Sequence, residues 1–178
     1  MAPSTLPQLW SRHMADSIQL LRLAPQARRW ADLGSGGGFP GLVIAIGLAG
    51  TEGAEVHLIE SNARKCAFLR AVARATGAPA RIHDARIETA LPPLAPTLQV
   101  VTARALAPLS DLLGLTASAL QAGAMGLFMK GEDARRELTE AERSWIVRAR
   151  FAPSLTDPKA GIVIVEGLAP RRPRDARP

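Results

Sequence analysis

A run of alternating glycines near the start of the chain carries the clearest chemical signal. Asp32, Gly34, Gly36 and Gly38 form a D-x-G-x-G-x-G pattern. Apolar residues precede the pattern and an apolar run follows it, which is the order of a strand, a tight turn and a helix. Glycine reaches positive φ and lets the backbone approach a ligand closely. The N–H groups at a helix start add a positive dipole end. The pattern therefore predicts a site for a nucleotide-like ligand.

The spacing of the glycines distinguishes between two cofactors. In the dinucleotide fingerprint G-x-G-x-x-G, a first glycine at Gly34 would place the third at position 39, which is Phe39. Asp32 also has no counterpart in that fingerprint. The next apolar segment ends at Glu60, where a carboxylate at a strand tip can accept both ribose hydroxyls of an adenosine. The pattern resembles the S-adenosylmethionine loop of class I methyltransferases, and an NAD-dependent oxidoreductase is the alternative.

Composition places the chain among folded, single-domain proteins. Its 178 residues are 47% hydrophobic and 21% charged, which suits one sizeable core. The single cysteine, Cys66, excludes an internal disulfide and suits a reducing compartment. No secretory leader or bilayer-spanning stretch is visible, so we expect a cytoplasmic protein without membrane contact. The net charge of +6 suits a polyanionic partner, although a gain in solubility explains it equally well.

Strand and helix patterns alternate along the chain, which predicts a mostly parallel sheet with helices on both faces. We expect strands at 30–33, 55–60, 80–83, 98–102 and 127–129, and an antiparallel edge pair at 151–155 and 162–165. We expect helices at 7–23, from position 40 to about 50, and at 63–76, 109–120 and 133–148, with a proline-containing loop at 91–96. The domains are an N-terminal helical segment (1–29), a main domain (30–167) and a disordered basic tail (168–178).

Four sequence elements in a fixed order resemble one family. They are R-H-x-x-D-S at 12–17, G-F-P-G at 38–41, a segment with I-E-S, R-K and F-L at 59–69, and T-A-R-A at 102–105 with M-K-G at 129–131. Over about residues 9–167 the chain resembles the RsmG (GidB) family, the bacterial 16S rRNA guanine-N7 methyltransferases. It departs from the family in carrying Glu60 where Asp is usual and only eight residues before Leu9.

The resemblance implies an α/β, Rossmann-like fold of the class I S-adenosylmethionine-dependent methyltransferases. It implies as substrate guanine 527 in the 530 loop of 16S rRNA, within the 30S subunit, and a monomer without a metal. Motif matches imply cofactor contacts at Gly34, Phe39, Ile87, Glu88 and Arg104. The glycine pattern and the acid after the second strand add Asp32, Gly36, Gly38 and Glu60. A ribosome-associated protein that keeps the fold without catalysis is a further alternative.

The chemistry of guanine N7 fits the absence of a recognisable general base or nucleophile motif. N7 carries an in-plane lone pair and no proton, so it can attack a sulfonium methyl directly. Catalysis then depends on positioning and electrostatic preorganisation. We expect Arg104, at a strand's carboxyl end, to act as the positioning residue. For RNA contacts the candidates are Arg12, His13, Arg64, Lys65 and Lys130.

Overall fold

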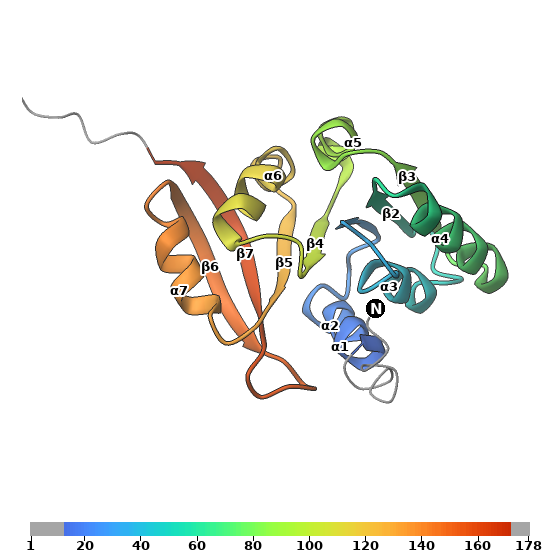
Figure 1. Cartoon of the computed structure of the whole chain (residues 1–178), viewed down its shortest axis with the longest axis horizontal. Coiled ribbons are helices and arrows are strands. Elements are labelled where there is room, and N and C mark those ends of the chain that lie inside the picture. Colours follow the sequence, from blue (N-terminus) through green and yellow to red (C-terminus); the bar gives the residue numbers. More distant parts are fainter. Residues whose placement is uncertain (1–12, 172–178) are drawn as a thin grey trace, which may run out of the picture.

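The computed structural model describes residues 13–171, which contain a seven-stranded sheet in the order β3-β2-β1-β4-β5-β7-β6 (Figure 1). β1 to β5 are parallel where they pair, β7 is antiparallel to β5, and β6 is antiparallel to β7. The expected mostly parallel sheet with an antiparallel edge is confirmed. The strands are β1 (Arg29–Leu33), β2 (Glu55–Glu60), β3 (Ala80–Asp84), β4 (Val100–Arg104), β5 (Met125–Lys130), β6 (Trp145–Pro153) and β7 (Gly161–Pro170).

Helices cover both faces of this sheet, and each face has its own cluster of buried side chains. One face carries α1 (Asp16–Ile18), α2 (Leu20–Leu23), α3 (Gly41–Gly47) and α4 (Ala63–Thr76). The other carries α5 (Ile87–Leu94), the 3-10 helix η3 (Ala95–Thr97), α6 (Leu109–Gln121) and α7 (Ala134–Ala141). In the part of the chain described, no helix combines the length and apolarity needed to cross a membrane.

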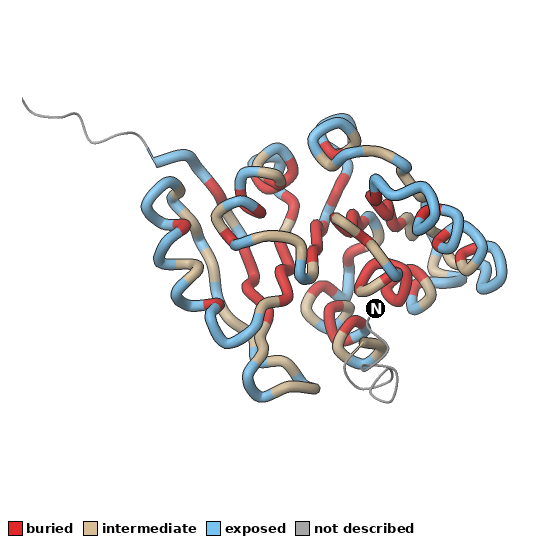
Figure 2. The backbone as a smooth tube through the Cα atoms, viewed as in Figure 1, coloured by how far each residue is buried: buried red, intermediate tan, exposed pale blue. Residues whose placement is uncertain are grey.

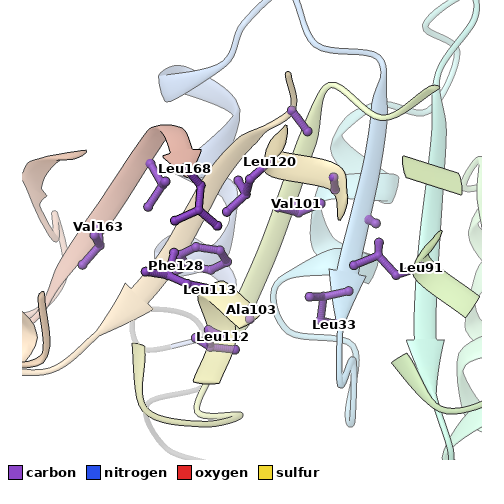
Figure 3. Close-up of a cluster of buried hydrophobic side chains, with 14 of the residues drawn as sticks. Leu33, Leu91, Val101, Ala103, Leu112, Leu113, Leu120, Phe128, Val163 and Leu168 are labelled. Atoms are coloured by element: carbon purple, nitrogen blue, oxygen red, sulfur yellow. The ribbon is translucent and has the colours of Figure 1, made fainter. Parts of the chain in front are cut away.

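The central strands contribute side chains to both clusters because successive side chains along a strand point to opposite faces of the sheet. In β1, Leu33 joins the cluster under α5 and α6, whereas Trp30 joins the cluster under α3 and α4. Phe128 in β5 lies beside Leu112 and Leu113 of α6 in the first of these clusters (Figure 3). Burial is concentrated in these strands, whereas the outward sides of α4 and α7 are exposed (Figure 2). Near-continuous apolar strands are expected where a sheet is covered on both sides.

The strand order reverses between β1 and β4, which opens a crevice at their carboxyl ends. The glycine turn follows β1 there, and Arg104 is the last residue of β4. Ala105 comes next and has φ +50, an uncommon value for a residue with a side chain. The fold thus brings together the two segments that the sequence singled out.

The helix expected at 133–148 is wrong in its second half. α7 ends at Ala141, and β6 begins at Trp145. Side chains alternate along β6, with Trp145 and Val147 packed on the core and Ile146 and Arg148 turned outward. The alternation of core-facing and outward side chains, with a period of two residues, determines that this segment is a strand, despite its high charge.

The loop expected at 91–96 is also wrong, since α5 continues to Leu94 and η3 follows. Leu91 is completely buried and Ala95 nearly so, whereas Pro92 and Pro93 face solvent in the last turn of the helix. Burial of the two apolar residues offsets the missing proline N–H groups.

The N-terminal helix is broken rather than continuous over its described part. α1 and α2 are separated at Gln19, whose Nε2 donates to the Asp16 carbonyl at 2.8 Å. The Ser17 hydroxyl likewise donates to the His13 carbonyl at 2.5 Å. These side chains compete with the helical ladder for its acceptors. At the other end, β7 runs to Pro170, three residues into the expected tail. Residues 1–12 and 172–178 of the predicted segments lie outside the described residues.

Candidate functional site

The glycine turn adopts the backbone that its sequence predicts. Gly34, Gly36 and Gly38 have φ values of +65, +53 and +92, a region that residues with a Cβ rarely adopt. The turn is held against β2 by the Ser35 N–H, which donates a hydrogen bond to the Ile59 carbonyl at 3.1 Å. A Cβ on Gly34 would lie 2.8 Å from Leu106 Cδ1. Only glycine therefore fits both the conformation and the space at the first position.

Asp32 anchors this turn to the helix behind it. Its Oδ2 accepts a hydrogen bond from the Gly41 N–H at 3.1 Å, at the start of α3. The side chain is 1% exposed, and Oδ1 has no hydrogen-bond partner among residues 13–171. Burial raises the pKa of this carboxyl to about 7, against the lowering effect of the nearby Ser35 hydroxyl and of the Gly41 N–H. Asp32 thus orients the turn through Gly41.

Glu60 connects the end of β2 to the same turn. Its Oε2 accepts from the Gly36 N–H at 3.0 Å, and its Oε1 accepts from the Asn62 N–H at 2.9 Å. Lys65 Nζ lies 3.7 Å from Oε2. Each carboxylate oxygen has a second lone-pair site, so both can still accept a hydroxyl proton. The longer Glu side chain is therefore held in place for the role that the sequence predicted for it.

A cavity of about 430 Å³, called here the first cavity, lies against these residues. Gly34, Glu60, Ile87 and Glu88 line it, which brings together four of the predicted cofactor contacts. Its apolar walls come from side chains of β2, α5, α6 and the segment after β4: Ile59, Ile87, Leu106 and Leu115. The other predicted contacts of this segment, Asp32 in β1 and Gly36, Gly38 and Phe39 in the turn, do not line this cavity.

These residues fit an adenosine-type cofactor such as S-adenosylmethionine. The volume lies within the roughly 300–1,000 Å³ typical of small-molecule sites. Apolar walls suit a flat base, and the oriented Glu60 carboxylate suits a ribose diol. Gly34, at φ +65, lines the cavity without a side chain, so a ligand can approach its backbone closely.

Arg104 lines a second cavity of about 350 Å³, formed by the ends of β4 and β5, the start of β7 and the α1 region. Arg104 Nη1 lies 3.8 Å from Asp16 Oδ2, and both side chains are mostly buried. Ala105 lines both cavities, so they meet at this residue. Arg104 thus lines the second cavity and not the first, which separates it from the predicted cofactor contacts that line the first cavity.

The predicted RNA contacts lie in different environments. Arg64 and Lys65 are exposed at the start of α4, which begins at Ala63 because Asn62 Oδ1 accepts from the N–H groups of both. His13 packs on Phe39, with ring centroids 5.1 Å apart, and so connects the N-terminal segment to the glycine turn. Arg12 lies outside the described residues.

Lys130 is held inside the second cavity by protein groups. Its Nζ donates to the Ala107 carbonyl at 2.6 Å and to Glu137 Oε2 at 2.8 Å. Its side chain is only 10% exposed. An ammonium has three donors, so one remains for a ligand in the cavity.

Sequence reasoning missed the contribution of Asp16 and of the β6–β7 turn to this cavity. Asp16 Oδ1 accepts from the hydroxyls of Ser154 and Thr156, both at 3.0 Å, which holds the turn against α1. The position of Asp16 within R-H-x-x-D-S was the available signal, whereas nothing in the sequence pointed to Ser154 or Thr156. In residues 13–171, no group of three or more His, Cys, Asp or Glu side chains is arranged to hold a metal ion.

Comparison with known proteins assigns the family. The family model GidB, described as rRNA small subunit methyltransferase G, matches residues 1–162. A protein named ribosomal RNA small subunit methyltransferase G from Methylorubrum populi is 52% identical over 169 residues, covering 95% of this chain and 80% of that protein. Its namesake from Parvibaculum lavamentivorans is 54% identical over 165 residues, covering 92% and 73%.

Solved structures share the fold at low sequence identity. Cofactor-bound Rv0187 from MTB superimposes with a TM-score of 0.62 at 18% identity, covering 85% of this chain and 78% of that one. A putative O-methyltransferase from Klebsiella pneumoniae also superimposes, with a TM-score of 0.60 at 14% identity, covering 86% of this chain and 79% of that one. The fold is shared with these proteins and is the class I methyltransferase fold that the glycine pattern indicated. With the family model matching most of its length, the chain belongs to the rRNA small subunit methyltransferase G family.

Proposed function

We propose that this protein transfers a methyl group from S-adenosylmethionine to N7 of guanine 527 in 16S rRNA, within the 30S subunit. The observation that carries the proposal is the meeting of two cavities at Ala105. The first has the carboxylate and apolar walls that an adenosine needs, and the second has polar groups that a base needs. Family membership supports the same reaction and directs it to small-subunit rRNA.

The residues act by binding and positioning. S-adenosylmethionine supplies an electrophilic methyl group when bound. Glu60 holds the ribose, and Gly34 lets the backbone approach the ligand closely. Arg104 positions the base at the junction, where burial strengthens its electrostatic effect. No residue needs to remove a proton from N7. Cys66 is fully buried on α4, and its thiol donates to the Glu60 carbonyl, so it is not placed for nucleophilic attack.

Attraction to RNA comes from basic side chains on α4 and in the N-terminal segment, of which Lys65 also lines the first cavity. α4 carries four basic side chains and no acidic one: Arg64, Lys65, Arg70 and Arg74. With Arg12 and His13, this helix supplies phosphate contacts whose strength falls as salt rises. Lys130 has a different role, because its ammonium is fixed between Ala107 and Glu137 inside the second cavity. The protein acts as a monomer in the cytoplasm.

In vitro methylation of purified 30S subunits tests the proposal. Subunits lacking the modification are incubated with the protein and S-adenosylmethionine, and the 16S rRNA is then digested and mapped by mass spectrometry. We expect one added methyl group, on N7 of guanine 527. Cofactor binding without any methyl transfer would favour the non-catalytic alternative, and tighter binding of NAD than of S-adenosylmethionine would favour the oxidoreductase.

A further inference from the structure

The second cavity presents charged groups of both signs to whatever enters it. Arg104 and Lys130 contribute cations, and Asp16, Glu137 and Asp157 contribute carboxylates, of which Glu137 is paired with Lys130 at 2.8 Å. Arg104, Lys130 and Asp16 are largely withdrawn from solvent, with side-chain exposures of 23%, 10% and 13%. Charges in such surroundings act strongly on a ligand because water screens them little. The cavity therefore selects for a ligand that has both an acceptor edge and a donor edge.

The two oxygens of Asp16 differ in what they can still bind. Oδ1 accepts from Ser154 Oγ, Thr156 Oγ1 and Gln19 Nε2, the last at 2.6 Å. These bonds hold Oδ1 in place and fill its acceptor sites. Oδ2 faces Arg104 at 3.8 Å, too far for a hydrogen bond. Within residues 13–171, the hydrogen bonds to this carboxylate therefore leave Oδ2 as the acceptor on the cavity side.

Guanine matches this arrangement, and adenine opposes it. Guanine carries the O6 acceptor next to N7 and has N–H donors at N1 and N2. Adenine places its N6 donor where guanine has O6, and it has no donor at N1 or C2. Cations at O6 and a carboxylate at N1–N2 thus favour guanine at both edges. Bound adenine would leave Oδ2 without a donor and direct its N6–H₂ toward cations.

Resting on the proposed function, we propose that the second cavity receives the target guanine after it leaves the base stack, and that Asp16 Oδ2 selects guanine by accepting from its N1–N2 edge. Enzymes that modify a base read it in this way once it is flipped out. Lys130 and Arg104 face O6, which places the neighbouring N7 toward Ala105 and the first cavity. The Ser154 and Thr156 hydroxyls are positioning groups, because they fix Asp16 without touching the base.

Nucleotide binding tests the site without any methyl transfer. Isotope-labelled protein with S-adenosylhomocysteine is titrated with guanosine 5′-monophosphate and separately with adenosine 5′-monophosphate, and amide shifts are followed by NMR. Both nucleotides carry the same phosphate, so a difference reports the base. We expect the guanine nucleotide to shift Gly131 and Gly161, which line the cavity, and to bind about tenfold more tightly, because one hydrogen bond to a charged group accounts for that ratio.

Asp16→Asn is the decisive variant, since its Oδ1 can keep accepting from Ser154 and Thr156 while an NH₂ replaces Oδ2. We expect the preference for guanine to fall about tenfold with little change in melting temperature. Asp133→Asn is the matched control, because it makes the same change at a carboxylate that is 60% exposed and lines neither cavity, so it should keep the preference.

Wild-type protein that shows no guanine preference, or an Asp16→Asn variant that keeps it, would overturn the inference. The wild-type titration stands by itself if the variant fails to fold. A protein that methylates 30S subunits but binds the nucleotide elsewhere would overturn the inference and leave the proposed function in place. A protein that binds guanine selectively here but methylates no RNA would overturn the function while the selectivity stands.

Discussion

Asp32→Asn should change how the stability of this protein depends on pH. Burial raises the pKa of Asp32 from 3.8 to about 7 in the folded protein. The folded state therefore holds this proton more tightly than the unfolded chain does. The resulting stabilisation is complete below the unfolded pKa and is lost as pH rises toward and through 7. An asparagine at this position does not titrate, so the variant loses this component of the pH profile.

The magnitude follows from the shift of about three pKa units. At about 1.4 kcal/mol per unit, the upper limit is about 4 kcal/mol of unfolding free energy between acid and alkaline conditions. His57 acts in the opposite direction, because burial and His83 lower its pKa to about 4. Its contribution is present above its unfolded pKa of 6.5 and is lost as pH falls toward 4. In the wild type, the contributions of Asp32 and His57 to the pH dependence of the unfolding free energy largely offset each other.

Urea unfolding of both proteins between about pH 4.5 and 8 measures the effect. The new amide has no acceptor for its NH₂ where Oδ1 stood, and this lowers the variant's stability by the same amount at every pH. Other carboxylates titrate equally in both proteins and cancel in the difference. As pH rises from about 4.5 to 8, we expect the unfolding free energy of wild type to fall by about 3 kcal/mol relative to that of the variant. A difference constant to within about 1 kcal/mol would refute the reasoning.

Three further substitutions test the site. Gly36→Val should abolish measurable S-adenosylmethionine binding in calorimetry, whereas Gly53→Val, at a similar φ of +71 but in the segment before β2, should keep it. Equal affinities would mean that the glycine turn is not the binding site. Arg104→Ala should lose far more of the single-turnover rate of 30S methylation than of the affinity for RNA. Arg104→Lys should recover that rate only in part, because an ammonium point charge cannot replace the two directed hydrogen bonds of a planar guanidinium. An alanine variant with the wild-type rate would show that Arg104 has no role in the site. Glu60→Gln should weaken cofactor binding at least tenfold, because one of its two backbone N–H partners would face an NH₂. Arg64→Ala, at an exposed residue that does not line the first cavity, should change the affinity little; comparable losses in both variants would contradict this.

The parts of the fold that the sequence predicts well are those where local signals agree with packing. α4 has the expected bounds because Asn62 caps its start and Gly77, with φ +62, ends it. The glycine turn is equally clear, since positive φ at Gly34, Gly36 and Gly38 matches the residue type. These signals act over a few residues and can be read directly from the chain.

The errors arise where long-range packing decides. The segment 91–96 contains prolines that indicate a loop, but burial of Leu91 against the core retains a helix. The turn between β6 and β7 reaches Asp16 across 138 residues of sequence, a contact that no local pattern encodes. The second cavity depends on that contact, so only its Arg104 and Lys130 could be foreseen.

Mapping the methylation of 16S rRNA from cells with and without the gene tests whether this protein methylates guanine 527. Mass spectrometry of the 530-loop fragment should find N7-methylguanine at position 527 in the parent strain and unmodified guanine in the deletion strain. Wild-type protein should restore the methyl group, and Gly36→Val protein at the same abundance should not. A deletion strain that keeps the methyl group at 527 would contradict the account.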